Sequence, residues 1–162
     1  GEVLAGDVTY IKLGSQFLYL AIVIDLYTRS VVGWSVQDSL HTKLVLDALA
    51  AAIMKVGPDA KVIFHSDRGS QYASDAYRKF CESNGVLPSM SRRGNCYDNA
   101  YVESWFAGFK KEWLYRRSYT TESELRSLIF DYIEVWYNRR RRHSALGYIS
   151  PLVFESNLAA QQ

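Results

Sequence analysis

Residues 8–37, VTYIKLGSQFLYLAIVIDLYTRSVVGWSVQ, decide the fold class of this 162-residue chain. The centre of this stretch, Phe17–Ile24, is a continuous apolar run of strand length, which is typical of a strand covered on both faces. Val8–Lys12 is rich in β-forming residues and is separated from the apolar run by a glycine-containing turn. Ser30–Gln37 follows the run after a second, polar turn. We therefore predict a three-stranded antiparallel meander with the second strand in its middle.

The period of the hydrophobic pattern changes after the meander. Apolar side chains recur at helical spacing between Val45 and Val56, and Gly57-Pro58 ends that pattern. A short buried strand at 61–65, a helix at about 74–83 and a short strand at 87–90 are expected next. The alternation of strands and helices predicts an α/β fold. Its five-stranded mixed sheet combines the antiparallel meander with parallel strands and carries helices on both faces.

Two further helices are expected to close the chain. The first runs from about 100 to 115 and has an aromatic-rich apolar stripe. The second begins at Thr121–Glu124, where Thr and Glu three residues apart form a capping box, and ends in Arg139–Arg142. Because no repeat, low-complexity tract or flexible linker interrupts the sequence, we predict one domain over residues 1–162 with a C-terminal helical extension from about 121.

Composition excludes several classes of protein. The longest apolar run is far shorter than the roughly 18 residues that a membrane span requires, so the sequence predicts a soluble protein without a membrane partner. Residues 1–4 lack the features of a signal peptide, and the segment is interpreted as an excised domain. Cys81 and Cys96 fit no metal-ligand spacing and are not needed as a disulfide in a chain of this size, which favours a reducing compartment.

The formal net charge of +2 is unevenly distributed along the chain. Residues 1–87 carry 8 basic and 9 acidic side chains, whereas residues 88–148 carry 11 basic and 7 acidic ones. The basic residues of the second part occur in clusters, which indicate either solvated faces or contacts with a polyanion. The clusters are Arg92-Arg93, Lys110-Lys111, Arg116-Arg117 and Arg139–Arg142.

Three carboxylates stand out as candidate metal ligands. Asp7 opens the first predicted strand and Asp67 closes the fourth, although aspartate is depleted in strands. Each has a structural alternative as a turn residue, since Gly6 precedes one and Arg68-Gly69 follows the other. Two acidic groups on neighbouring strands repel each other unless a cation lies between them. A sheet of this type places such side chains in the crevice at its strand ends, which favours a divalent metal site.

Glu103 is the best candidate for a third carboxylate. It is expected in the first turn of the aromatic helix, where Lys110 returns to nearly the same azimuth. The alternative is an ordinary first-turn glutamate favoured by the helix dipole, and Asp98 fits better as the helix N-cap. Hard oxygen ligands suit Mg²⁺ or Mn²⁺ rather than zinc.

With these motifs in place, the chain resembles the catalytic core of bacterial insertion-sequence transposases in the retroviral-integrase superfamily, which carry an Asp, Asp, Glu triad. Thirty-five residues lie between Asp67 and Glu103, the spacing for which this family is known. One departure is Leu4, where many relatives have Trp. The matching stretches are Gly6–Ile11, Phe64–Tyr72, Ser89–Ala100 leading to Glu103, Tyr137-Asn138, Arg142-His143, Leu146 and Tyr148–Pro151.

The resemblance implies an RNase H-like fold and a polynucleotidyl transferase that moves a mobile DNA element. It implies two Mg²⁺ ions per active site, for which Mn²⁺ can substitute, with Asp7 bridging the ions and Asp67 and Glu103 each completing one site. The implied chemistry is strand cleavage at the element ends, followed by joining to target DNA through a 3′-hydroxyl. The implied partners are DNA and further copies of the chain, as a homodimer or larger assembly, in the bacterial cytoplasm at the nucleoid.

Further roles follow from position relative to the triad. Lys110 and Lys111 are expected to contact DNA, and the loop with Arg92 and Arg93 is expected to lie over the site. Two residues are expected to support the ligands from behind: His65, two residues before Asp67, through a hydrogen bond, and Asn99, just before the aromatic helix. The roles of Arg139–Arg142 in binding phosphate or a second subunit remain open. Trp34, Tyr10 and the helix aromatics are assigned to the core.

Two other functions compete with this interpretation. A plain ribonuclease H or resolvase-type nuclease would share the fold but would lack the Ser66–Gln71 and Asp98–Ala100 blocks. A catalytically inactive, transposase-derived module for DNA binding or oligomerisation would be favoured by loss of an acidic ligand. All three acidic residues are present, which favours the enzyme.

Overall fold

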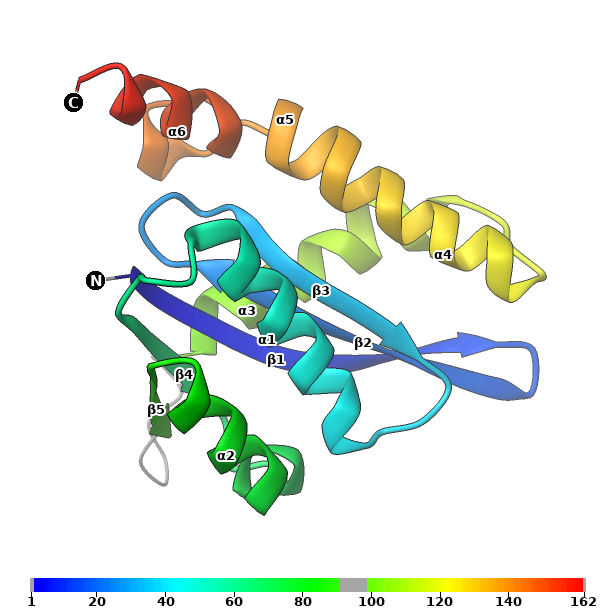
Figure 1. Ribbon diagram of the computed structural model, residues 1–162. Helices are drawn as coiled ribbons and strands as arrows, with labels where there is room; N and C mark the ends of the chain where they lie inside the picture. The colour runs from blue at the N-terminus through cyan, green and yellow to red at the C-terminus, as the bar shows by residue number, and fades with distance from the viewer. Residues whose placement is uncertain (1, 91–98, 162) are drawn as a thin grey trace.

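The computed structural model describes residues 2–90 and 99–161 and has a five-stranded sheet at its centre (Figure 1). The strand order is β3-β2-β1-β4-β5. Antiparallel pairing joins β3 to β2 and β2 to β1, and parallel pairing joins β1 to β4 and β4 to β5. This arrangement confirms the predicted meander and mixed sheet. The strands are β1 (Glu2–Leu13), β2 (Gln16–Asp25), β3 (Val31–Gln37), β4 (Val62–Ser66) and β5 (Val86–Met90).

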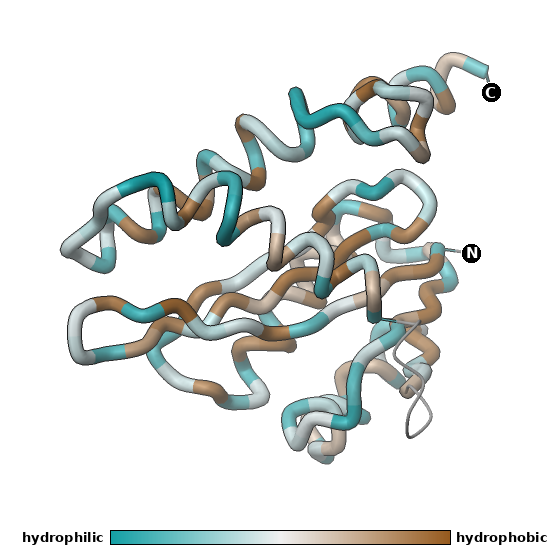
Figure 2. Tube along the Cα trace, turned by 180° about the vertical axis from the view of Figure 1, so that it is seen from behind, coloured by the Kyte–Doolittle hydropathy of each residue, from teal (hydrophilic) through white to brown (hydrophobic). Residues whose placement is uncertain are grey.

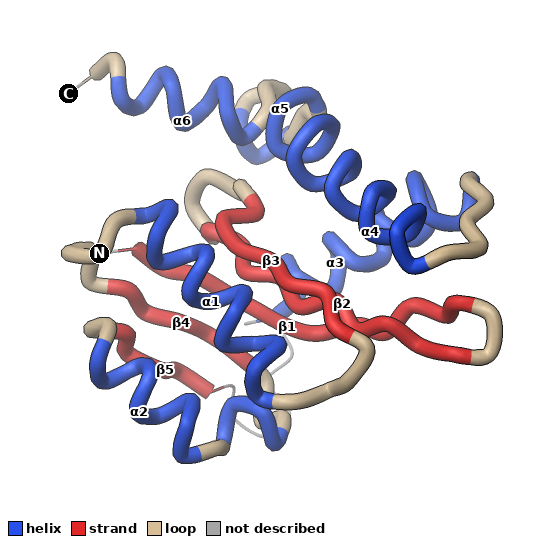
Figure 3. The backbone as a smooth tube through the Cα atoms, turned by 45° about the vertical axis from the view of Figure 1, so that its right-hand side comes forward, coloured by secondary structure: helices blue, strands red, loops and turns tan. Residues whose placement is uncertain are grey.

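Helices cover both faces of the sheet, and each face has its own hydrophobic core (Figure 3). One face packs against α1 (Thr42–Val56) and α2 (Asp75–Ser83), and the other packs against α3 (Ala100–Gly108) and α4 (Glu122–Phe130). The strand β2 contributes side chains to both cores, because successive residues of a strand point to opposite faces. This is why its sequence reads as an uninterrupted apolar run.

The C-terminal third forms a helical arm beside the sheet (Figure 1). The aromatic helix α3 continues into a π-helical segment, η3 (Phe109–Trp113), and a short 3₁₀ turn, η4 (Leu114–Arg116). The capping box at Thr121 and Glu124 is present at the start of α4, as predicted. The arm then continues through η5 (Asp131–Tyr137), α5 (Asn138–Arg140), η6 (Ser144–Leu146) and α6 (Pro151–Ala159).

A buried asparagine ties the arm to the sheet. The Asn138 Oδ1 accepts a hydrogen bond from the Val31 backbone N–H at 2.9 Å, and Asn138 Nδ2 donates to the Val31 carbonyl at 3.0 Å. Both polar backbone groups of Val31 are thereby satisfied at a position that is 1% exposed.

Hydrophobic residues are concentrated along the sheet strands (Figure 2). In the described ranges, no helix is both long enough and apolar enough to cross a membrane.

The start of β1 differs from the sequence-based expectation. We expected Asp7 to open the first strand, but β1 begins at Glu2 and Asp7 lies in its interior, opposite Ile22 of β2. The first residues of β1 pair with both neighbours, with Leu4 beside Phe64 of β4 as well as Asp25 of β2. Pairing with both neighbouring strands makes β1 begin earlier in the sequence than the local strand propensity predicted.

Close packing between α1 and β3 predicts a strong effect for Gly33→Ala. A Cβ at Gly33 would lie 2.1 Å from the backbone oxygen of Ala48 and 2.7 Å from the backbone nitrogen of Ala52. Because backbone atoms of a packed helix cannot move aside singly, we expect the variant to lose about 3 kcal/mol of unfolding free energy in a urea titration. Ala51→Ser, at an exposed position of α1, is the matched control with a change within about 0.5 kcal/mol. A Gly33→Ala variant as stable as the control would contradict this packing.

Candidate active site

The register of the parallel strands β1 and β4 brings two of the predicted acidic residues to the same level. Ala5 of β1 is paired with His65 of β4 in the parallel register. Asp7 and Asp67 each lie two residues further along their own segment, so they come to the same level. The strand β4 ends at Ser66, whereas β1 continues to Leu13. The two aspartates line one cavity of about 160 Å³, together with Gln71 and Tyr72. The sheet edge predicted to carry the site therefore gathers both side chains.

Asp7 is half-buried and has two hydrogen-bond donors. Its Oδ1 accepts from the Val8 backbone N–H at 2.8 Å, and its Oδ2 accepts from Asn99 Nδ2 at 3.1 Å. Burial, together with the negative charges of Asp67 and Glu103, raises the pKa of Asp7 from 3.8 to about 6, although these two hydrogen bonds lower it. Asp7 is thus the carboxylate on which burial and the charges of the other two acids converge.

Asp67 is exposed and is oriented by a local turn. Its Oδ1 accepts a hydrogen bond from the Gly69 backbone N–H at 2.8 Å. A Cβ at Gly69 would lie 2.9 Å from the same Asp67 oxygen and 2.7 Å from Gln71 Oε1, so a larger residue here would displace one or both of these side chains. The turn chemistry that offered a structural alternative for Asp67 therefore also fixes the direction of its carboxylate toward the cavity.

Glu103 lies in the first turn of α3, as expected, and its side chain is exposed. It is close enough for its charge to raise the pKa of Asp7. Within residues 2–90 and 99–161, no three Asp, Glu, His or Cys side chains converge to ligate a single metal ion. The electrostatic contacts instead join Asp7 to Asp67 and Asp7 to Glu103, which leaves Asp7 common to both pairs.

The donor set around Asp7 fits a hard divalent cation. All three carboxylates offer oxygen ligands, and Mg²⁺ is held in proteins by one or two carboxylates together with water. Asn99 is buried beside Asp7, and its Oδ1 has no hydrogen-bond partner among the described residues. Water bound to a cation at Asp7 is a suitable donor to this oxygen. A hydrated cation at Asp7 would reduce the repulsion between the acids and would give the unpaired Asn99 oxygen a donor.

Basic and aromatic side chains lie beside this acidic cavity. Lys110 is half-buried, which lowers the pKa of its ammonium group, and its Nζ lies 5.4 Å from the ring centroid of Tyr10. Lys111 is exposed on the next position. The assignment of Tyr10 to the core was wrong: its side chain is 62% exposed and packs edge-on against Phe17 near the end of the β1–β2 hairpin. Trp34 does pack against the core.

The structure leaves some predicted residues undescribed and gives others contacts that differ from those expected. Arg92 and Arg93, with Cys96 and Asp98, lie outside the described residues. The N-cap position of α3 is Asn99 rather than Asp98, and the Asn99 side chain contacts Asp7 instead of capping the helix. His65 lies on β4 opposite Ala5, and the described part of the chain shows no hydrogen bond from its ring.

Two residues that line the cavity, Tyr72 and Gln71, were not predicted from the sequence. Tyr72 is 3% exposed, and burial, followed by the charges of Asp7 and Asp67, raises the pKa of its hydroxyl group well above its usual value. Gln71 lines the same cavity from the 3₁₀ turn η1 (Ser70–Ala73). Both belong to the motif Phe64–Tyr72, so the available signal was their closeness to Asp67 in sequence.

The sheet order, the helices on both faces and the aspartates on adjacent parallel strands define an RNase H-like fold. Two models of the integrase core domain family match the chain, one over residues 1–96 and the other over residues 84–151. The chain therefore belongs to the integrase core domain family.

Named relatives and solved structures agree with this family. The chain is 44% identical over 156 residues to the transposase InsF of insertion sequence IS3A from Escherichia coli K12, covering 96% of the chain and 54% of the relative. It is 43% identical over 154 residues to the transposase of element IS904 from Lactococcus lactis, covering 95% of the chain and 61% of that protein. The chain thus spans about half the length of the curated relatives that it matches.

The structural neighbours are retroviral integrases. The simian T-cell lymphotropic virus intasome in complex with a PP2A regulatory subunit matches with a TM-score of 0.75 at 18% identity, over 94% of this chain and 53% of that one. The HTLV-2 integrase catalytic core domain in complex with magnesium matches with a TM-score of 0.71 at 16% identity, over 94% of both chains. At these identities the likeness shows the fold alone.

Proposed function

We propose that this chain is the catalytic domain of an insertion-sequence transposase that cleaves and joins DNA strands with divalent metal ions. The observation that carries the proposal is the position of Asp7, half-buried on the central strand, with the charges of Asp67 and Glu103 opposing its own. A bound cation stabilises the ionised form of such a carboxylate. The resemblance of the sequence to transposases supports DNA as the substrate.

In this proposal the three acidic residues are the ligands of two Mg²⁺ ions. Asp7 is the shared ligand, Asp67 completes one site and Glu103 completes the other. The chemistry supplied by bound Mg²⁺ is activation of the attacking oxygen and stabilisation of the leaving 3′-oxygen in an in-line displacement. Asn99 holds the Asp7 carboxylate in place through its hydrogen bond, and the Gly69 N–H does the same for Asp67.

The remaining partners follow from the same proposal. Lys110 and Lys111 lie beyond Glu103 on the same helical segment and contact phosphates of the DNA. Moving a DNA element requires both of its ends, so the complete protein acts as a homodimer or larger assembly. The HTLV-2 integrase core is described in dimeric and trimeric forms, which supports such assembly. Bacterial relatives of this kind support action in the cytoplasm at the nucleoid.

A Mn²⁺ titration tests the division of ligands. We expect the wild-type chain to bind two Mn²⁺ ions in isothermal calorimetry at neutral pH. Because Asp7 is shared, Asp7→Asn is expected to bind none tightly, whereas Glu103→Gln retains one ion. Glu82→Gln, which removes an exposed carboxylate of α2, is the control and is expected to bind two ions.

Two results would contradict the proposed ligands. The same stoichiometry in Glu103→Gln as in the wild type would remove Glu103 from the metal site. Absence of Mn²⁺ binding to the folded wild type at millimolar concentrations would contradict the metal-dependent mechanism. It would favour the alternative function, a catalytically inactive module for DNA binding or oligomerisation.

A further inference from the structure

A second, larger cavity lies where the C-terminal arm meets the core. Its volume is about 490 Å³, and it shares no lining residue with the acidic cavity of Asp7 and Asp67. Arg29 reaches it from the turn between β2 and β3, and Tyr101 and Trp105 reach it from α3. The motif around Arg142-His143 and Tyr148, which the proposed chemistry does not use, forms another part of its wall.

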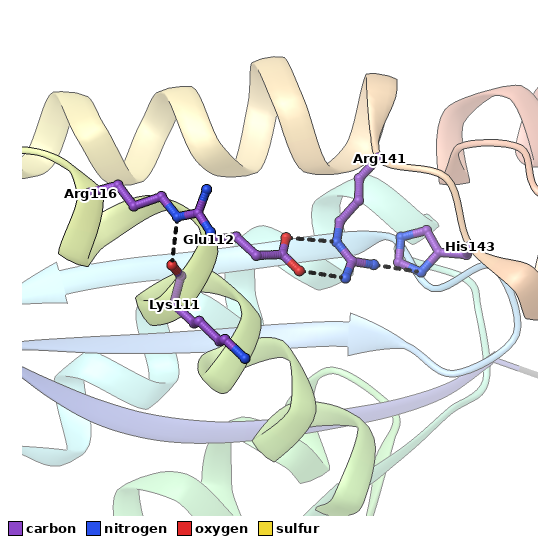
Figure 4. Close-up of polar contacts among 5 residues, drawn as sticks. All are labelled: Lys111, Glu112, Arg116, Arg141 and His143. Atoms are coloured by element: carbon purple, nitrogen blue, oxygen red, sulfur yellow. Dashed lines mark hydrogen bonds and ion pairs between the residues drawn. The ribbon is translucent and has the colours of Figure 1, made fainter.

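Three residues that line this cavity each carry a buried hydrogen-bonding atom without a partner among the described residues: Arg29 Nη1, Trp105 Nε1 and His143 Nε2. The first two are always donors. His143 Nδ1 lies 3.4 Å from Arg141 Nη1, and because arginine only donates, Nδ1 acts as the acceptor (Figure 4). The neutral imidazole then carries its proton on Nε2. All three unpaired atoms are therefore hydrogen-bond donors. A ligand group that carries only hydrogen-bond acceptors would fit them.

The electrostatic environment of the cavity is positive. Arg141 donates to both carboxylate oxygens of Glu112, at 3.1 and 3.3 Å, so this acid is already paired (Figure 4). No acidic side chain is among the described residues that line the cavity, whereas Arg29, Arg141 and Arg142 are. Burial, then the charges of Arg141 and Arg29, lowers the pKa of His143 to about 4, which keeps its ring neutral. The acceptor that fits this environment is an anion.

The backbone is strained at two residues that line this cavity. Arg29 and Tyr148, each with φ of 63°, are the non-glycine residues with positive φ in the described part of the chain. Such conformations cost about 1 kcal/mol or more each for ordinary residues and concentrate at binding and catalytic sites. The strain sets the direction of both side chains at the cavity, which points to a role in ligand binding.

Aromatic rings surround the anionic subsite. Tyr101 is 49% exposed and Tyr148 is 71% exposed, so each presents a ring that a ligand can contact. The Arg29 guanidinium lies 3.7 Å from the centroid of the Tyr101 ring. Stacking in this way occupies the face of the guanidinium and leaves its N–H edge free to bind an oxyanion. Exposed aromatic rings beside arginines are the combination that binds single-stranded nucleic acid.

We propose that this cavity binds one nucleotide unit of a DNA strand. Arg29, Trp105 and His143 donate to its phosphate, and Tyr148 at the mouth of the cavity stacks against its base. Arg29 is half-buried, and rotation of its long side chain brings the unpaired Nη1 to the phosphate. The choice of DNA rests on the proposed function, whereas the preference for an anion rests on the three donors and on the arginines that line the cavity.

The test uses the indole N–H signals of the ¹⁵N-labelled chain in EDTA, so that the acidic cavity carries no metal ion. On titration with an eight-residue oligothymidylate, we expect the Trp105 signal to shift more than that of Trp34, whose Nε1 donates to Glu134. Arg29→Gln is expected to bind the oligonucleotide about tenfold more weakly, the loss of one charge-assisted contact. Arg78→Gln, at an exposed arginine of α2 that pairs with Asp75 outside the cavity, is the matched control and should bind within about twofold of wild type.

Separate outcomes decide the two proposals. Inorganic phosphate is titrated in parallel, and a Trp105 shift with phosphate but not with the oligonucleotide overturns the nucleotide site. A Trp105 shift no larger than that of Trp34 with the oligonucleotide also overturns it, and this wild-type measurement stands even when Arg29→Gln fails to fold. Metal-dependent DNA cleavage without the Trp105 response contradicts the cavity proposal alone. The Trp105 response without cleavage contradicts the proposed chemistry alone.

Discussion

The Asp67→Asn variant is expected to lose metal-dependent DNA cleavage and strand joining by about a thousandfold or more. The substitution keeps the size of the side chain and its acceptor for the Gly69 N–H, so the turn after β4 survives. It removes one negative ligand oxygen from the cavity that Asp67 shares with Asp7. Since metal ions contribute several kcal/mol of transition-state stabilisation in such reactions, losing one ion accounts for a rate change of this size.

The measurement is cleavage and joining of a labelled DNA element end in Mg²⁺ by the complete protein of the proposed function, with salt-dependent DNA binding measured alongside. Binding is expected to be retained, because it depends on basic residues. Asp75→Asn serves as a matched control: this exposed aspartate at the start of α2 pairs with Arg78 and does not line the cavity. Undiminished cleavage by Asp67→Asn would remove Asp67 from the catalytic site.

The Asp7→Asn variant is expected to abolish activity and yet to stabilise the metal-free protein at pH 7. Burial and the neighbouring acids raise the pKa of Asp7 from 3.8 to about 6, so ionising it in the folded state costs at most about 3 kcal/mol. The amide has one oxygen and cannot accept from both Val8 and Asn99, which costs about 1 kcal/mol. A net gain of about 1 to 2 kcal/mol in unfolding free energy is therefore expected.

The direction of the Asp7 pKa shift determines how the stability difference between Asp7→Asn and the wild type depends on pH. Because the folded pKa is raised, the stabilising contribution of protonated Asp7 is complete below pH 3.8 and is lost as the pH rises to about 6. The stability advantage of Asp7→Asn should thus be present at pH 7 and absent at pH 4 in urea titrations without metal. Added Mg²⁺ should raise the stability of the wild type and leave the variant unchanged. A variant less stable than wild type at pH 7 would show that Asp7 carries no electrostatic strain.

The sequence predicted the strands and helices that have strong local signals. The apolar run of β2, the capping box at Thr121 and the helical period of α1 each depend on residues near one another, and each is present. The start of β1 was misplaced because Glu2–Leu4 acquires its strand conformation from pairing with β4 and β2. The exposure of Tyr10 was missed because an aromatic residue in a strand is usually covered.

Some features of the candidate site were also predicted from the sequence, whereas others were found only in the structure. The identities of Asp7, Asp67 and Glu103 followed from the sequence, because acidic residues are unusual at strands and the spacing of the last two matches a known family. Their mutual placement did not, because it depends on the parallel register of β1 and β4 and on how α3 packs against the sheet. The sequence predicted Asn99 as a support for the ligands, but its hydrogen bond to Asp7 and the one from the Gly69 N–H to Asp67 were found only in the structure.

The sequence by itself determined the fold class and the acidic residues, since both depend on residue type and on short-range period. Only the tertiary structure decided that Asp7 is the half-buried acid common to two pairs, and that Arg29, Trp105 and His143 share a cavity. These residues lie far apart in the chain, on the turn after β2, on α3 and in the C-terminal arm. Burial, pKa shifts and unpaired donors arise from neighbours in space, and the order of residues along the chain does not encode those neighbours locally.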